Sequence, residues 1–182
     1  MSRTPSDHSG AWGPAVLRVV TGTLMAGHGL QKLAGWFGGS GLAPTAAGFE
    51  RMALRPARHH AVVAGVGETA SGVASVLGLW TPAASAITSG TMTIAVAKVH
   101  GRHGPWITKG GYEYNVTLMA TSFALAAVGP GRLALDGHLT RRRAGLGWAV
   151  AQLGVGVATA MAVLAVSARW PEPEPAADGA PA

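Results

Sequence analysis

Five apolar segments, each close to the length that crosses a bilayer, dominate this chain of 182 residues. A hydrocarbon core of about 30 Å requires about 20 helical residues. The segments cover residues 14–33, 60–79, 83–99, 112–129 and 146–168. Charged residues make up only 12% of the chain and lie mostly between the segments. We therefore predict an all-α integral membrane bundle whose helices alternate in direction, with the bilayer as its surroundings.

Composition excludes several kinds of site. There is no cysteine, which rules out disulfides, a thiolate nucleophile and cysteine-ligated iron–sulfur clusters. The net charge of +6 is spread over the loops, a pattern that argues against nucleic acid and favours anionic lipid headgroups. Small residues at Gly22 and Ala26, and at Gly154, Ala158 and Ala162, predict close helix contacts.

Ionisable side chains interrupt the apolar segments or lie just beyond their ends. They are His28, Lys32, Glu68, Lys98, His100 and Glu113. If the segments alternate in direction, all six lie near one membrane face. Because ionisable groups are costly in hydrocarbon, we expect a polar site between the helices at this face. Glu68 lies about a third of the way into its segment, and we expect Lys32 or His28 to be its partner.

Each of these residues also has a structural interpretation. The lysines and Glu113 lie near segment ends, where side chains can reach water, and His28 could bond a backbone carbonyl. Arg18, near the opposite face, is interpreted as a snorkelling or interhelical structural residue. The spacing predicts no metal site, and haem ligation by His28 and His100 is a weak alternative.

Four regions follow from this pattern. Residues 1–13 form a polar N-terminal segment, 14–136 the main bundle, 137–170 a basic loop with an additional transmembrane helix, and 171–182 an acidic, Pro/Ala-rich tail that we predict to be disordered. Between the first two apolar segments, residues 45–52 predict a short surface helix, and Trp36 and Phe37 could anchor at the interface.

Several motifs occur in an order that resembles the DoxX family of small integral membrane proteins. They are GHGLQKLAGWFGGSGL (residues 27–42), Phe49-Glu50, AGVGETASGVASVLGLWTPAAS (64–85), AKVHGRHGPW (97–106), GYEYNVTLM (111–119) and GPGRLALD (129–136). The resemblance implies a four-helix membrane core over residues 14–136, to which the last apolar segment adds a fifth helix. The matching motif positions are His28, Lys32, Glu68, His100, Glu113 and Asn115.

The resemblance also implies a redox setting, because some relatives are subunits of thiosulfate:quinone oxidoreductase and others belong to oxidoreductase complexes that act in oxidative-stress defence. The first hypothesis is a plasma-membrane subunit that binds quinone. Its candidate catalytic residues are Glu68, His28, Lys32 and Glu113, and its candidate quinone-binding residues are His28, Lys32, His100, Asn115 and Trp36. The alternative is a non-catalytic scaffold that anchors a soluble oxidoreductase. A proton-coupled transporter is the weakest hypothesis, since no inverted repeat is evident. Whether the chain is itself an enzyme stays open.

Overall fold

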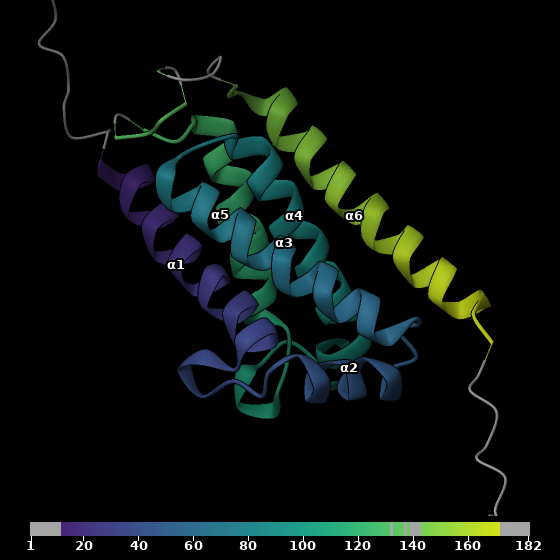
Figure 1. Cartoon of the computed structure of the whole chain (residues 1–182). Coiled ribbons are helices and arrows are strands. Elements are labelled where there is room, and N and C mark those ends of the chain that lie inside the picture. The colour runs from purple at the N-terminus through teal and green to yellow at the C-terminus, as the bar shows by residue number, and fades with distance from the viewer. Residues whose placement is uncertain (1–11, 132, 137, 139–142, 172–182) are drawn as a thin grey trace, which may run out of the picture.

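The computed structural model of the chain describes residues 12–131, 133–136, 138 and 143–171. Within these residues the protein is all-α, as the apolar pattern predicted (Figure 1). Its helices are α1 (Trp12–Ala34), α2 (Leu42–Arg51), α3 (Ala57–Leu77), α4 (Thr81–Ala95), α5 (Glu113–Val128) and α6 (Leu146–Arg169). A π-helical turn at Val96–His100 continues α4. Nearly all of the predicted disordered tail lies outside the described residues, as does most of the polar N-terminal segment.

All five apolar segments form helices, and α2 occupies the loop where a short surface helix was expected. By length and composition, two of the described helices could cross a membrane: α3 and α6, with mean hydropathies of 1.2 and 2.0. α1 is long enough but carries Arg18 and Lys32. α4 has 15 residues and is only about 23 Å long, shorter than the hydrocarbon core. Crossing by all five helices therefore stays a prediction.

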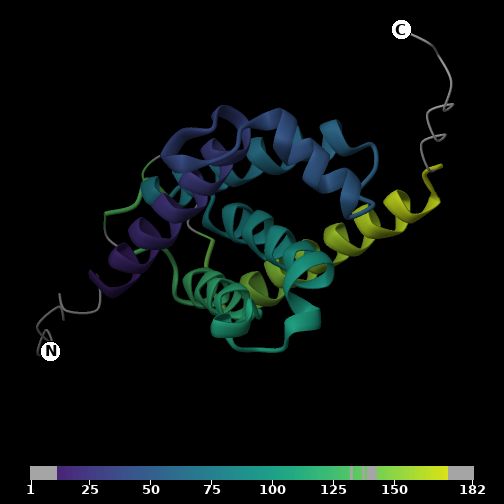
Figure 2. The same cartoon turned by 90° about the horizontal axis from the view of Figure 1, so that it is seen from below.

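The short helix α4 lies inside the bundle, packed against α3, α5 and α6 (Figures 1 and 2). Its buried residues are mostly small or carry hydroxyls: Thr81, Pro82, Ala84, Ser85, Thr88, Ser89, Gly90 and Met92. Such a helix buries little apolar surface in lipid, so its neighbours must shield it. They do so on three sides, and α4 becomes the polar interior of the bundle.

The contact between α4 and α6 corrects one expectation. Gly154 and Ala158, predicted to face a neighbouring helix, are exposed. The contact uses the row two residues further along, where a Cβ on Gly156 would lie 2.6 Å from the carbonyl oxygen of Ala86. This row also carries Gln152, whose Oε1 accepts a hydrogen bond from Ser89 Oγ at 3.0 Å. The face of α6 that turns inward is marked by its buried residues, which are Ala149, Gln152, Gly156, Ala160 and Ser167.

Helices α1 and α3 meet backbone to backbone. A Cβ on Gly72 would lie 2.3 Å from Ala26 N and 2.5 Å from Gly22 O, closer than real Cβ atoms approach. A Cβ on Gly29 would lie 2.5 Å from the Gly65 carbonyl oxygen. The predicted small-residue face at Gly22 and Ala26 is thus in use, and its partner is the glycine row of α3.

One end of the bundle is closed by the segment that follows α5. Arg18 is buried there, and its guanidinium donates to the carbonyl oxygens of Ser75 and Val76 at the end of α3. It also donates to Pro130 O at 3.0 Å and to Leu133 O. Arg18 is therefore the interhelical structural residue that the sequence suggested.

The same closing segment caps α4. Asp136 accepts hydrogen bonds from Trp80 N at 2.9 Å, Thr81 N at 3.0 Å and Thr81 Oγ1 at 2.8 Å. These amides belong to the start of α4, where helical N–H groups have no partner inside the helix. A residue far along the chain thus supplies the N-cap.

Replacing Gly72 by alanine tests the backbone contact. The added Cβ would force α1 and α3 apart, and overpacking of this kind costs about 1–3 kcal/mol of unfolding free energy. Thermal unfolding of the purified chain in detergent measures the loss. Gly67→Ala is the matched control on the same helix, because its Cβ would meet Ile87 Cγ2 at an ordinary 3.5 Å. Equal midpoints for the two variants would contradict the close packing.

Candidate functional site

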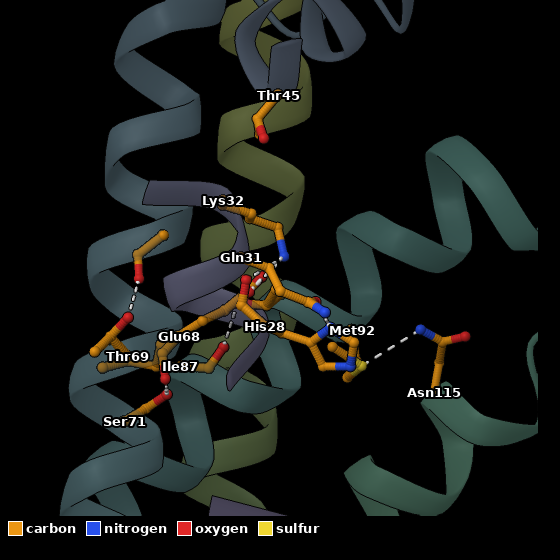
Figure 3. Close-up of polar contacts among 12 residues, drawn as sticks. His28, Gln31, Lys32, Thr45, Glu68, Thr69, Ser71, Ile87, Met92 and Asn115 are labelled. Atoms are coloured by element: carbon orange, nitrogen blue, oxygen red, sulfur yellow. Dashed lines mark hydrogen bonds and ion pairs between the residues drawn. The ribbon is translucent and has the colours of Figure 1, made fainter. Parts of the chain in front are cut away.

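An ion pair joins α1 and α3 near the end of the bundle opposite Arg18. Lys32 Nζ lies 2.5 Å from Glu68 Oε2 (Figure 3). The Glu68 side chain is 2% exposed and that of Lys32 25%. Of the two partners expected for Glu68, Lys32 is the one in contact, and its Nζ also donates to His28 O at 3.4 Å. The buried carboxylate is therefore compensated by a cation from the same chain.

His28 turns away from this pair and joins Gln31. Its Nδ1 lies 3.0 Å from Gln31 Oε1, while Gln31 Nε2 donates to the carbonyl oxygen of Phe37 at 3.2 Å. Because the Phe37 carbonyl oxygen can only accept, the atom of the Gln31 side-chain amide that contacts it must be the nitrogen. Gln31 Oε1 therefore faces the His28 imidazole. Nδ1 therefore carries the proton. In the neutral ring, Nε2 is then an acceptor, and it has no partner among the described residues.

The loop after α1 holds Gln31 in this orientation. Gly41 N donates to Gln31 O at 3.0 Å, and the chain at Gly39 passes so close to Gln31 that a Cβ there would lie 2.5 Å from Gln31 Cα. Phe37 adopts a positive φ of 53°, which turns its carbonyl toward the amide. The glycine-rich sequence after α1 thus serves to fold the loop back onto the helix.

An open groove of about 510 Å³ runs along the outer side of α1 and α3. Its wall is apolar over most of its length, and its residues are Thr23, Leu24, Ala26, Gly27, His28, Leu30, Gln31, Phe37, Val73, Val76 and Leu77. His28, Gln31 and Phe37 come from the last turns of α1 and the following loop. The groove therefore has a polar end near the loop after α1 and an apolar stretch that leads to the last turn of α3.

The other predicted residues at this end of the bundle do not converge on the ion pair. His100 Nδ1 donates to Gly110 O at 2.7 Å. Glu113 Oε1 accepts from Ile107 N at 2.7 Å. Both contacts fold the loop between α4 and α5. Lys98 makes no hydrogen bond or ion pair within the described part of the chain.

Asn115 and Trp36 also take separate positions. Asn115 is buried in α5, and its Nδ2 lies 3.3 Å from Met92 Sδ (Figure 3). The Trp36 ring packs edge to face on Phe37, with ring centroids 6.2 Å apart, and Trp36 is not among the groove residues. Of the predicted quinone-binding residues, only His28 lines the groove.

Sequence reasoning missed Gln31 as a site residue. The sequence reasoning selected ionisable side chains, and Gln31, an uncharged amide between His28 and Lys32, was not among them. The available signal was the position of Gln31 in an apolar helix, shortly before a glycine-rich loop. A polar side chain there can form hydrogen bonds to the helix and to the loop.

Comparison with known proteins identifies one family. Residues 13–101 match the family model described as DoxX. The match covers α1 to α4 and ends at the first residue after the π-helical turn. No curated protein and no solved structure matches the chain.

Glu68→Gln tests how far the ion pair stabilises the bundle. Removal of the carboxylate charge leaves the Lys32 ammonium half-buried without a counter-ion, and breaking a buried pair costs about 3 kcal/mol. The double variant Glu68→Gln/Lys32→Met removes both charges and should recover part of this loss. Thermal unfolding of the single and double variants provides the comparison. A double variant that loses the sum of both single effects would show that the two charges do not interact.

Proposed function

This chain belongs to the DoxX family of membrane proteins, and we propose that it is a multi-pass plasma-membrane subunit that binds a quinone between α1 and α3. The observation that carries the proposal is the apolar groove that ends at the His28–Gln31 pair. The proposal has two parts, the crossing of the membrane by five helices and the binding of quinone in the groove.

The tryptophans support the five crossings. All six are between 43% and 62% exposed, and all lie in the first or last turns of helices or in the connections between them. Alternating directions assign Trp12, Trp80 and Trp148 to one end of the bundle and Trp36, Trp106 and Trp170 to the other. Tryptophan is enriched at both membrane interfaces. α1 and α6, with 23 and 24 residues, are about 35 Å long, which suits the separation of two such belts.

The groove suits an isoprenoid quinone. Its apolar stretch of leucine and valine side chains would hold the tail, and its polar end near the interface would hold the headgroup. When bound, a quinone supplies the two-electron chemistry, so the protein has only to position it and handle protons. Neutral His28 would accept a hydrogen bond from a quinol hydroxyl at Nε2, and protonated His28 would donate to a quinone carbonyl. Gln31 orients the His28 imidazole for both contacts.

The remaining predicted residues act at a distance from the groove. Lys32 and Glu68 bind the last turns of α1 to α3 and so position the wall that carries His28. Electrons would come from a soluble oxidoreductase partner, which fits a role in sulfur oxidation or oxidative-stress defence. The loops at the same end expose Arg102 and Lys109, which an acidic partner surface would complement.

Single cysteines distinguish five crossings from two. The chain has none of its own, so Ser40→Cys, Arg102→Cys and Leu133→Cys report one position each. With five crossings, a membrane-impermeant maleimide should label Ser40→Cys and Arg102→Cys from one side and Leu133→Cys from the other. If only α3 and α6 cross, Arg102→Cys and Leu133→Cys will share a side, and the five-crossing topology is wrong.

Quinone content of the purified chain tests the groove. The measurement is native mass spectrometry or extraction of chain purified from its own membrane. His28→Leu keeps the wall apolar but removes the hydrogen bond, and we expect about tenfold weaker retention. His59→Leu, on the exposed start of α3, is the matched control.

Glu68→Gln separates the groove from a site at the ion pair. If the quinone lies in the groove, this variant should keep more quinone than His28→Leu. The reverse order would place the quinone at the ion pair. A wild-type chain that copurifies with soluble proteins but with no quinone would favour the scaffold alternative.

A further inference from the structure

A second cavity, of about 10 Å³, lies inside the bundle where α1, α3, α4 and α5 meet. Hydroxyl side chains from all four helices line it: Thr21, Ser75, Ser85, Thr88 and Ser122. Met25 and Leu125 complete much of the wall. The described lining residues include no titratable group, and α1 contributes Thr21, Gly22 and Met25. The cavity shares no lining residue with the groove.

The hydrogen bonds around this cavity are incomplete. Thr21 Oγ1 donates to Leu17 O at 2.7 Å, and Ser75 Oγ donates to Arg18 O at 3.3 Å. In contrast, the hydroxyls of Ser85, Thr88 and Ser122 make no hydrogen bond within the described part of the chain. These three residues are only 6%, 7% and 7% exposed. Among the described residues, the fully enclosed side-chain polar atom without a partner is Gln152 Nε2, so these three hydroxyl oxygens keep a small accessible area. A hydroxyl inside the bundle still gains from a hydrogen-bond partner, and three at one cavity can share one.

We propose that this cavity binds one water molecule. A volume of 10 Å³ is at the lower limit for a single water and too small for an organic ligand. Ser85, Thr88 and Ser122 can each donate or accept, whereas Thr21 and Ser75 have used their protons and offer lone pairs. A water molecule has two protons and two lone pairs, so it can accept from two of the unpartnered hydroxyls and donate to two of the remaining oxygens.

The water would act as a hydrogen-bonded junction of the four helices. Hydroxyls on α3, α4 and α5 that do not reach one another would bond through it. In a bilayer no outside solvent could replace it, because hydrocarbon offers no hydrogen-bond partner. The polar interior contributed by α4 would then be satisfied from within the bundle.

Solid-state NMR of the labelled chain in lipid bilayers tests for the water directly. Magnetisation transferred from water protons should reach Thr88 and Ser122. Ala160, which is 0% exposed and has no hydroxyl, serves as the dry buried reference. Transfer to Thr88 and Ser122 above this reference supports the proposal. Transfer no stronger than at Ala160 overturns it, whatever the variants show.

Variants test whether the water stabilises the bundle, because a wet and a dry cavity predict opposite signs. Thr88→Val keeps the shape but removes a hydroxyl. With water bound, it should lower the unfolding midpoint by about 2–4 °C, and Ser122→Ala should do likewise. The double variant should lose less than the sum, since both changes affect the same water. In a dry cavity Thr88→Val removes an unpaired hydroxyl and raises the midpoint, which would overturn the proposal. Thr91→Val is the control, because its hydroxyl donates to Ile87 O of its own helix at 3.0 Å.

Discussion

Backbone contact between α1 and α3 is the constraint on which most other features depend. With glycine at the crossing points, no side chain separates the two helices, and their neighbouring turns lie within reach of each other. Lys32 can therefore meet Glu68 between the helices, where the carboxylate is buried. The same approach makes the outer sides of both helices into walls of one groove. Charge pairing on the inner side and an apolar groove on the outer side are two results of a single contact.

The sequence predicted well how far along its helix a residue lies, and predicted poorly which side of the helix the residue faces. Alternating helix directions predicted Lys32 or His28 as the partner of Glu68, and Lys32 is the one in contact. The same argument grouped His28 and Lys32 on one face, four residues apart. In the structure the long lysine side chain bends inward while the His28 ring joins Gln31 on the outside. The position of a residue along its helix follows from counting residues. The side that it faces depends on helix packing, which here involves glycines distant in the sequence.

Five of the ionisable residues in and beside the apolar segments divide into two kinds. Lys32 and Glu68 satisfy each other, and Glu113 and His100 each bond a backbone group of the loop between α4 and α5. These contacts account for residues that sequence reasoning treated as one site. His28 differs, since one ring nitrogen is fixed by Gln31, the other has no partner among the described residues, and the residue lines an open groove. An ionisable residue in or beside an apolar segment was thus a sign of a structural contact in most cases and of an available functional group in one.

The cap on α4 has a consequence for how the protein is made. Trp80 N and Thr81 N bind a carboxylate that lies 56 and 55 residues further along the chain. During synthesis, α3 and α4 leave the ribosome well before Asp136, so the start of α4 waits with unpaired amides until α5 has followed. Ser89 of α4 meets Gln152 of α6 later still. The α3–α4 hairpin is therefore an unfinished intermediate of biogenesis, and its lifetime is set by the rate at which the rest of the chain is translated.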